Sequence, residues 1–306
     1  MQPDYKKEQN NIKQTKLQGH LAIFAANVIF GLGVPVSKAL LNDWVTPMGY
    51  MASRSFFAAV IFWLIAAFLP SEKVERRDLW VILGGGLLGF VISQSLTAWA
   101  LDYTTPVYFS LIAALTPVAV MLMAALFISE RITLVKLLGV VLGIGGALLM
   151  LAKGWQSGAG KNDFLGIILA VLSVLTWAVY LIVTRSVSQK YTAVTQMKWV
   201  FLISAIVTVP IALREWDMQP LYSAAANWAG IGEMAFLVLG ATVLGYFLIP
   251  VAMKSLAATT VSIYTNLQPV VASLVAIAIG QDVLTWDKPV AAVLVLLSAW
   301  IVTREK

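Results

Sequence analysis

Charged side chains and cysteine are scarce in this chain. Asp, Glu, Lys and Arg make up 12% of its 306 residues, against about a quarter in a typical soluble domain. The absence of cysteine excludes disulfides and thiolate metal sites, and the single histidine, His20, cannot form a histidine metal cluster. The remainder is 60% apolar, with a mean hydropathy of +0.85. Such a composition requires lipid rather than water around most of the chain.

Apolar runs recur along the whole sequence. A helix needs about 20 mostly apolar residues to cross the hydrocarbon core of a bilayer, and runs of this length are separated only by short gaps. We therefore expect an all-α membrane protein without a separate soluble domain, preceded by a cytosolic N-terminal segment at 1–17. The ten expected transmembrane helices are 18–40, 48–69, 79–102, 104–128, 134–152, 164–187, 193–213, 229–253, 257–280 and 287–303.

The basic residues indicate the orientation of the chain. The formal charge of +6 is spread over the short gaps rather than gathered on one face, which argues against nucleic acid as a partner. With both termini in the cytosol, 15 Lys and Arg residues lie inside and four, Lys153, Lys161, Arg214 and Lys288, lie outside. Cytosolic loops carry this kind of excess. We expect an integral protein of a bacterial-type inner membrane with cytosolic termini.

The second half of the chain repeats the first. At an offset of 152 residues, Ala100–Lys136 aligns with Ala252–Lys288 without a gap and pairs Pro117 with Pro269. Each half holds five expected helices, 18–152 and 164–303, and an odd number forces the halves to enter the membrane in opposite directions. Inverted repeats of this kind are typical of transporters, with substrate held near the midplane where the repeats meet.

With this repeat, the chain resembles the drug/metabolite transporter superfamily, specifically the EamA-type ten-helix exporters. The resemblance covers residues 18–303 and implies two inverted five-helix repeats and the export of small metabolites. The motifs that carry it are Phe30-Gly31 through Lys38, Pro47 through Arg54, Thr116-Pro117, Ser129-Glu130-Arg131, and the repeated Gln268-Pro269 and Gln281-Asp282.

Polar and aromatic residues inside the expected helices predict a central cavity. Groups of this kind are costly in a bilayer unless they face partners or water, and many of them fall at equivalent positions in the two halves. Helix–helix hydrogen bonding or core packing is the alternative for each one singly. The candidates for substrate binding are Asn27, Phe30, Arg54, Gln94, Tyr108, Thr116, Trp177, Tyr180, Tyr246, Tyr264 and Gln268.

Arg54 is the most informative of these candidates, because it lies nearly two turns inside the second expected helix. A guanidinium at such a depth costs about 2.5–3.5 kcal/mol on insertion scales. One interpretation is that Arg54 extends to the outer interface or bonds a helix end. The other is that it attracts or holds a substrate carboxylate.

Transporter is the favoured function class. An intramembrane enzyme would need a nucleophile with a base, paired carboxylates or metal ligands, and the acidic residues all lie in loops or near helix ends. We therefore expect no catalytic residue, metal or cofactor. A channel is disfavoured by the inverted repeat and the missing filter-like loop.

Amino acids or related metabolites are the substrate class that the resemblance implies. Cationic drugs and nucleotide sugars stay open as alternatives. The expected partners are this small molecule and the lipid bilayer, with the chain a monomer or a homodimer. Because no acid lies deep in the membrane to relay protons, we expect facilitated transport down the gradient of the substrate.

The expected orientation can be tested with single cysteines in this cysteine-free chain. Cysteine at Ser71 should be protected from an impermeant thiol reagent in intact cells, and cysteine at Ser157 should be labelled. The reverse labelling pattern would overturn the orientation.

Overall fold

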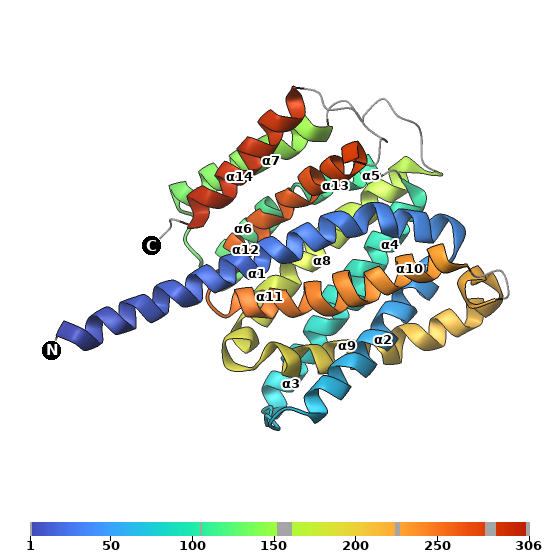
Figure 1. Cartoon of the computed structure of the whole chain (residues 1–306), viewed down its shortest axis with the longest axis horizontal. Coiled ribbons are helices and arrows are strands. Elements are labelled where there is room, and N and C mark those ends of the chain that lie inside the picture. The colour runs from blue at the N-terminus through green and yellow to red at the C-terminus, as the bar shows by residue number, and fades with distance from the viewer. Residues whose placement is uncertain (1, 105, 152–160, 224–226, 279–285, 304–306) are drawn as a thin grey trace.

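Helices make up almost all of the chain in the computed structural model, which describes residues 2–104, 106–151, 161–223, 227–278 and 286–303 (Figure 1). No strand occurs within these ranges. The elements in chain order are α1 (Gln2–Asp43), α2 (Pro47–Ala67), α3 (Arg76–Gly86), η1 (Leu87–Ile92), α4 (Ser93–Tyr103), α5 (Pro106–Ala113), α6 (Thr116–Ile128), α7 (Leu134–Leu151), α8 (Asp163–Lys190), α9 (Ala193–Ala212), η3 (Leu213–Met218), η4 (Pro220–Tyr222), α10 (Trp228–Phe236), η5 (Leu237–Gly245), α11 (Tyr246–Met253), α12 (Ala258–Ile263), η6 (Tyr264–Asn266), α13 (Leu267–Ala278) and α14 (Asp287–Thr303).

Several of these elements join end to end into longer rods. The segments α3–η1–α4 and α10–η5–α11 are continuous, whereas α5–α6 and α12–η6–α13 are interrupted. Counted in this way, the described residues form ten rods, each of which overlaps one of the ten expected spans. Six rods are each long and apolar enough to cross a membrane, and α6, α7 and α14 contain shorter apolar helices. The prediction of an all-α membrane protein with ten helices is confirmed.

The first helix is longer than the sequence suggests. Residues 2–17, expected as a separate polar segment, continue α1, so that this helix protrudes beyond the bundle on the left in Figure 1. The helix α14 ends at the same end of the bundle, as an even number of crossings requires. We call this the termini end. The repeat boundaries 18–152 and 164–303 stay a prediction, because residues 152–160 lie outside the described ranges.

The two halves depart from regular α-helix at equivalent places. The third and eighth rods contain the π-helical segments η1 and η5, which overlap at the offset of 152 residues. The fourth and ninth rods are interrupted just before the paired prolines, Pro117 and Pro269. Proline lacks the N–H of a helical residue, and its ring clashes with the carbonyl group four residues earlier, here Ala113 and Thr265, which explains both interruptions. Internal duplication is therefore visible in the backbone as well as in the sequence.

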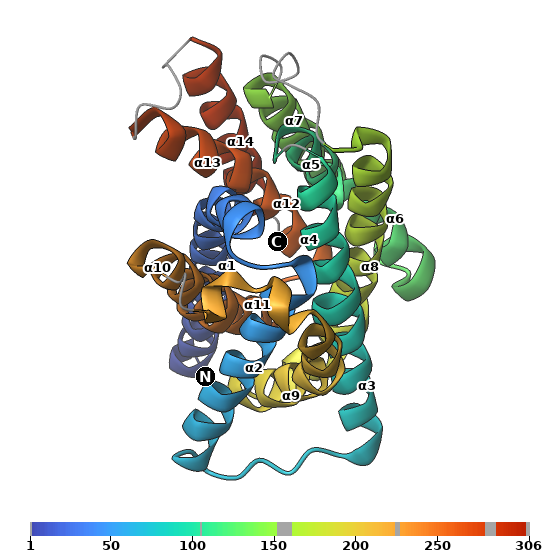
Figure 2. The same cartoon turned by 90° about the vertical axis from the view of Figure 1, so that its right-hand side faces the viewer.

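Equivalent helices of the two halves pack against each other. The helix α7 packs on α14 and α2 packs on α9, and the two pairs lie on opposite sides of the bundle in Figures 1 and 2. The helices α2 and α9 also begin alike, because Thr46 and Thr192 each cap the helix by accepting a backbone N–H three residues on. The remaining rods fill the space between these pairs.

Two glycines bring the third rod close to α8. A Cβ atom at Gly85 would lie 2.3 Å from Cγ2 of Thr184, and one at Gly89 would lie 2.3 Å from Cγ of the Tyr180 ring. A larger side chain at either place would push the two helices apart. The four-residue spacing of small residues therefore serves close helix packing here, as it does in membrane helices generally.

Candidate functional site

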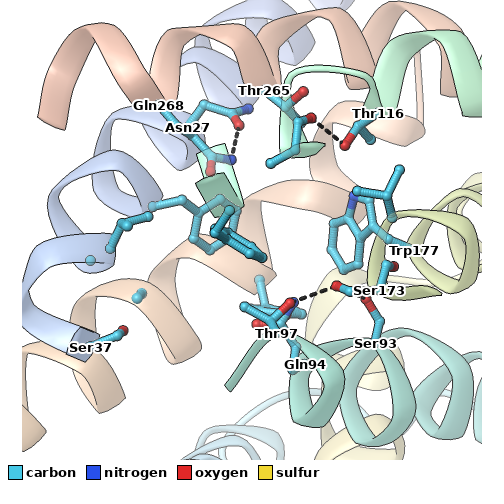
Figure 3. Close-up of a pocket in the computed structure, with 18 of the residues that line it drawn as sticks. Asn27, Ser37, Ser93, Gln94, Thr97, Thr116, Ser173, Trp177, Thr265 and Gln268 are labelled. Carbon is cyan, nitrogen blue, oxygen red and sulfur yellow. Dashed lines mark hydrogen bonds between the residues drawn. The ribbon is translucent and has the colours of Figure 1, made fainter. Parts of the chain in front are cut away.

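An internal cavity lies where the two halves of the chain meet. Its volume is about 140 Å³, and the π-helical segment η5 and the interruptions of the fourth and ninth rods all contribute to its wall. Seven rods line it, namely α1, α2, α3–η1–α4, α5–α6, α8, α10–η5–α11 and α12–η6–α13. Figure 3 shows the polar side chains and the indole ring of Trp177 that point into it.

Most of the sequence-predicted site residues come together at this cavity. Eight of the eleven line it: Asn27, Phe30, Arg54, Gln94, Thr116, Trp177, Tyr246 and Gln268. Several of them, among them Phe30, Gln94 and Trp177, are only half-buried although they lie in the middle of the bundle. Their exposed surface faces the cavity. Whether they bind substrate stays a prediction.

Three predicted residues are not part of the cavity wall. Tyr180 is 2% exposed and lies behind Trp177, with ring centroids 4.8 Å apart. The Tyr264 hydroxyl turns toward the termini end and hydrogen-bonds Nδ1 of His20 at 2.9 Å. Tyr108 is half-buried in α5 and is also absent from the lining residues. Tyr108 and Tyr264 belong to the fourth and ninth rods, whose interruptions break the regular helical spacing on which their prediction was based, whereas Tyr180 lies in the uninterrupted helix α8.

Two clusters of neutral polar groups lie on the cavity wall. The Gln268 amide donates through Nε2 to Oδ1 of Asn27 at 2.8 Å, and Asn27 donates through Nδ2 to the Ile23 carbonyl oxygen at 2.9 Å. Across the cavity in Figure 3, the hydroxyls of Thr97 and Ser173 are 2.7 Å apart. Amides and hydroxyls can both donate and accept hydrogen bonds. These clusters suit a small molecule with several polar groups.

Aromatic rings form the apolar part of the wall. Tyr246 packs edge-on against Phe30 and Trp177, with ring centroids 5.6 and 5.9 Å away. Behind it, Phe201 lies 5.8 Å from the Tyr246 ring and stacks on Phe62. Contacts of this edge-to-face kind hold the rings in place. The cavity therefore has a rigid aromatic wall and a polar wall.

Arg54 is buried and faces the cavity. It is 3% exposed, which is inconsistent with the interpretation that it extends to the membrane surface. Its Nε donates to Oγ1 of Thr242 at 2.6 Å and its NH1 donates to the Tyr50 hydroxyl at 2.8 Å. The guanidinium also lies over the rings of Tyr50 and Phe90, at 4.9 and 5.3 Å from their centroids. Both hydrogen-bond partners are neutral side chains.

Sequence reasoning missed the small hydroxyl residues and one tyrosine of the wall. Tyr50, Ser93, Thr97, Ser173 and Thr265 line the cavity but were not expected there. Helical spacing could have identified most of them, since Tyr50 lies four residues before Arg54, Thr97 three after Gln94, and Ser173 four before Trp177. Serine and threonine are common in membrane helices as packing residues, which is why they gave no distinct signal.

Among the described residues, the cavity lining contains one charged side chain, Arg54, and no carboxylate. The described residues form no group of His, Cys, Asp or Glu that could hold a metal ion. The chemistry that this wall offers is hydrogen bonding, aromatic contact and one positive charge. Such groups bind and orient a small molecule.

An ion-pair cluster joins the two halves at the termini end. Glu130, after α6, accepts from Nζ of Lys136 at 2.7 Å and lies 3.6 Å from NH1 of Arg185 in α8. The Thr259 hydroxyl at the start of α12 also donates to Glu130. The Glu130 and Lys136 side chains are only 11% and 9% exposed. This cluster links the end of α6 to α7, α8 and α12.

Ten membrane helices around a central cavity, with a wall of polar and aromatic side chains, are typical of one class of protein, the integral membrane transporters. The family model of the EamA-like transporter family matches this chain twice, at residues 17–152 and 164–304. The chain belongs to this family, within the drug/metabolite transporter superfamily. The resemblance inferred from the motifs is thereby confirmed, as is the repeat of the two halves.

Similar proteins carry transporter names. The chain is 25% identical to the uncharacterized transporter YyaM of Bacillus subtilis over 83% of each chain. It is 27% identical to a probable terminal-alkyne amino-acid exporter of Streptantibioticus cattleyicolor over 74% of each chain. A crystal structure with 18% sequence identity superposes with a TM-score of 0.76 and covers 95% of this chain and 98% of its own, which confirms the fold.

Trp177 allows a test of the cavity wall. We expect Trp177→Ala to reduce transport about tenfold or more while lowering the unfolding temperature only slightly, because the half-buried indole faces the cavity. A fully packed tryptophan would instead cost about 3–5 kcal/mol of stability on truncation. Transport in proteoliposomes and thermal unfolding in detergent are the two measurements.

Trp80→Ala is the matched control, since Trp80 is 75% exposed on the outside of α3. It should retain both transport and stability. A Trp177→Ala protein that folds and transports like the unchanged chain would remove Trp177 from the site.

Proposed function

We propose that this protein carries small amino-acid-like metabolites across a bacterial-type inner membrane by alternating access. The observation that carries the proposal is the cavity itself, which is bounded by both halves of the chain at the points where their helices are interrupted. Transporters with inverted repeats hold substrate in this place, between discontinuous helices near the midplane. Rocking of one half against the other would expose the cavity to each side in turn.

The size of the cavity supports a small substrate. Its volume of about 140 Å³ is close to that of an engineered cavity of about 150 Å³ that accepts benzene. An amino acid with a small or medium side chain is of this order, whereas a nucleotide sugar is several times larger. The amino-acid exporter among the relatives supports the same class. Cationic drugs stay the alternative.

The orientation, the partners and the energy source belong to the same proposal. The excess of Lys and Arg in the loops of one side supports cytosolic termini. The proposed partners are the substrate and the lipid bilayer, without nucleic acid, and the protein acts as a monomer or homodimer. The cavity wall has no carboxylate among the described residues to bind a proton in turn with a cation, which supports facilitated transport without catalysis or a cofactor.

Counterflow in proteoliposomes tests the transport function. Vesicles preloaded with an unlabelled amino acid should take up the labelled form in a saturable manner, since a carrier exchanges substrate in both directions. Thr97→Phe, which places a ring in the cavity, should abolish uptake. Ile92→Phe on the exposed face of the same rod should leave it intact. Uptake that never saturates, or that survives Thr97→Phe, would contradict a carrier using this cavity.

A pH step tests the energy source. With equal substrate on both sides, a pH difference across the vesicle membrane should drive no net accumulation, because the cavity wall offers no acid that could couple protons to substrate. A substrate gradient alone should drive flux under the same conditions. Sustained uphill accumulation that collapses on adding a protonophore would show proton coupling and sink the facilitated mechanism.

A further inference from the structure

We infer that Arg54 is the anchor for an anionic group of the substrate, most simply a carboxylate, and that this charge decides which molecules the cavity accepts. The inference rests on the proposed function, because it assigns the substrate class of that cavity. An anchor of this kind makes the cavity accept zwitterions and anions and reject simple cations. The transport function alone makes no such distinction.

The first observation is a buried charge without a counter-ion. Arg54 is 3% exposed, and no ion pair of the described residues includes it. Burying one member of an ion pair without the other is strongly unfavourable. Charged residues inside membrane proteins accordingly pair with one another or mark the path of a substrate or ion. In this cavity the missing negative charge is supplied by the ligand.

The second observation is that neutral hydroxyls hold the guanidinium in place. The Thr242 hydroxyl donates to the Leu237 carbonyl oxygen at 2.8 Å within the π-helical segment η5, so its oxygen is free to accept from Nε of Arg54. Tyr50 shares a hydrogen bond of 2.8 Å with Ser37, which in turn lines the cavity. A third hydroxyl, that of Tyr246, also interacts with Arg54. These contacts fix the orientation of the Arg54 guanidinium group without neutralising its charge.

The third observation is that the fold does not need a charge at this position. Counted from the capping threonines, Arg54 in α2 corresponds to Val200 in α9, the equivalent helix of the other half. Val200 is buried and apolar, and α9 packs as well as α2 does. A charge at this position is thus present in only one of the two equivalent helices. Such asymmetry is expected of a ligand contact rather than of a packing requirement.

The rest of the wall fits the remainder of such a substrate. The amide oxygens of Asn27 and Gln268 and the hydroxyls of Thr97 and Ser173 offer neutral acceptors for an amine or hydroxyl. The described lining residues include no carboxylate that could bind a cation, and the Arg54 guanidinium would repel a cation. A cationic compound without an anionic group is therefore excluded, and an amino acid or a small carboxylic acid is accepted.

Binding of a charged and a neutral isostere tests the anchor directly. We would measure the affinity of purified full-length protein in detergent for benzoate and for benzamide by titration calorimetry. The two probes share a ring and shape but differ in charge. Benzoate should bind at least about tenfold more tightly, as expected for hydrogen bonds to a charged group. Equal affinities, or no binding of either probe, would overturn the inference.

Arg54→Met and Arg54→Lys complete the test. Methionine removes the charge at similar length, so the preference for benzoate should disappear, whereas lysine should retain part of it without the two-pronged geometry. Lys198→Gln is the matched control, because Lys198 on α9 lies over the Trp63 ring at 5.2 Å and does not line the cavity. That variant should keep the full preference.

Stability distinguishes a binding role from a structural one. In Arg54→Met, the Tyr50 and Thr242 hydroxyls keep their hydrogen bonds to Ser37 and Leu237. Tyr246 loses its contact with Arg54, but the cost of burying an unpaired charge is also removed, so the unfolding temperature without ligand should change little. A large loss of stability in this variant, or a preference for benzoate that survives it, would show that Arg54 does not anchor the ligand. A protein that exchanges amino acids without preferring benzoate refutes only the anchor, and one that prefers benzoate without exchange refutes only the carrier function.

Discussion

The constraint on which this structure depends is that backbone polar groups inside a bilayer must find partners within the protein. Regular helices satisfy it automatically, but the interruptions of the fourth and ninth rods do not. There the Leu115 N–H donates to the Ile112 carbonyl oxygen at 3.0 Å, and the Thr116 hydroxyl donates to the Ala113 carbonyl oxygen at 2.6 Å. In the ninth rod, the Thr265 hydroxyl donates to the Ser262 carbonyl oxygen at 2.7 Å. Threonine hydroxyls thus supply hydrogen bonds to backbone carbonyl oxygens at the interruptions beside the cavity.

The same constraint explains why neutral polar side chains lie inside the bundle and most charged side chains lie near its ends. Hydroxyls and amides tolerate the membrane interior when they bond to one another or to a carbonyl oxygen, and they make up most of the polar part of the cavity wall. Ion pairs are placed near the ends of the bundle instead, as in the cluster of Glu130, Lys136 and Arg185. Against this arrangement, Arg54 stands out as a charge in the interior with only neutral partners.

Duplication of a five-helix unit gives the protein two nearly equivalent halves, and the differences between them make the cavity asymmetric. The two halves match in the π-helical segments, the paired prolines and the capping threonines. They differ at two pairs of equivalent positions: Arg54 corresponds to Val200, and Thr116 corresponds to Gln268. The shared features build the bundle, while the unshared side chains give the cavity a different wall on each side.

The sequence by itself determined the ten helices, the repeat and the family, because the length of an apolar run and the spacing of paired motifs are properties of the chain alone. It also placed Asn27, Phe30 and Trp177 on the faces that line the cavity. Only the tertiary structure decided that Tyr180 lies behind Trp177 and that Tyr264 turns toward His20. It also decided that Arg54 is held by Tyr50 and by Thr242. The position of Thr242 depends on the π-helical segment η5. Helical periodicity assumes a regular rod, and the rods of this protein are irregular where the site is built.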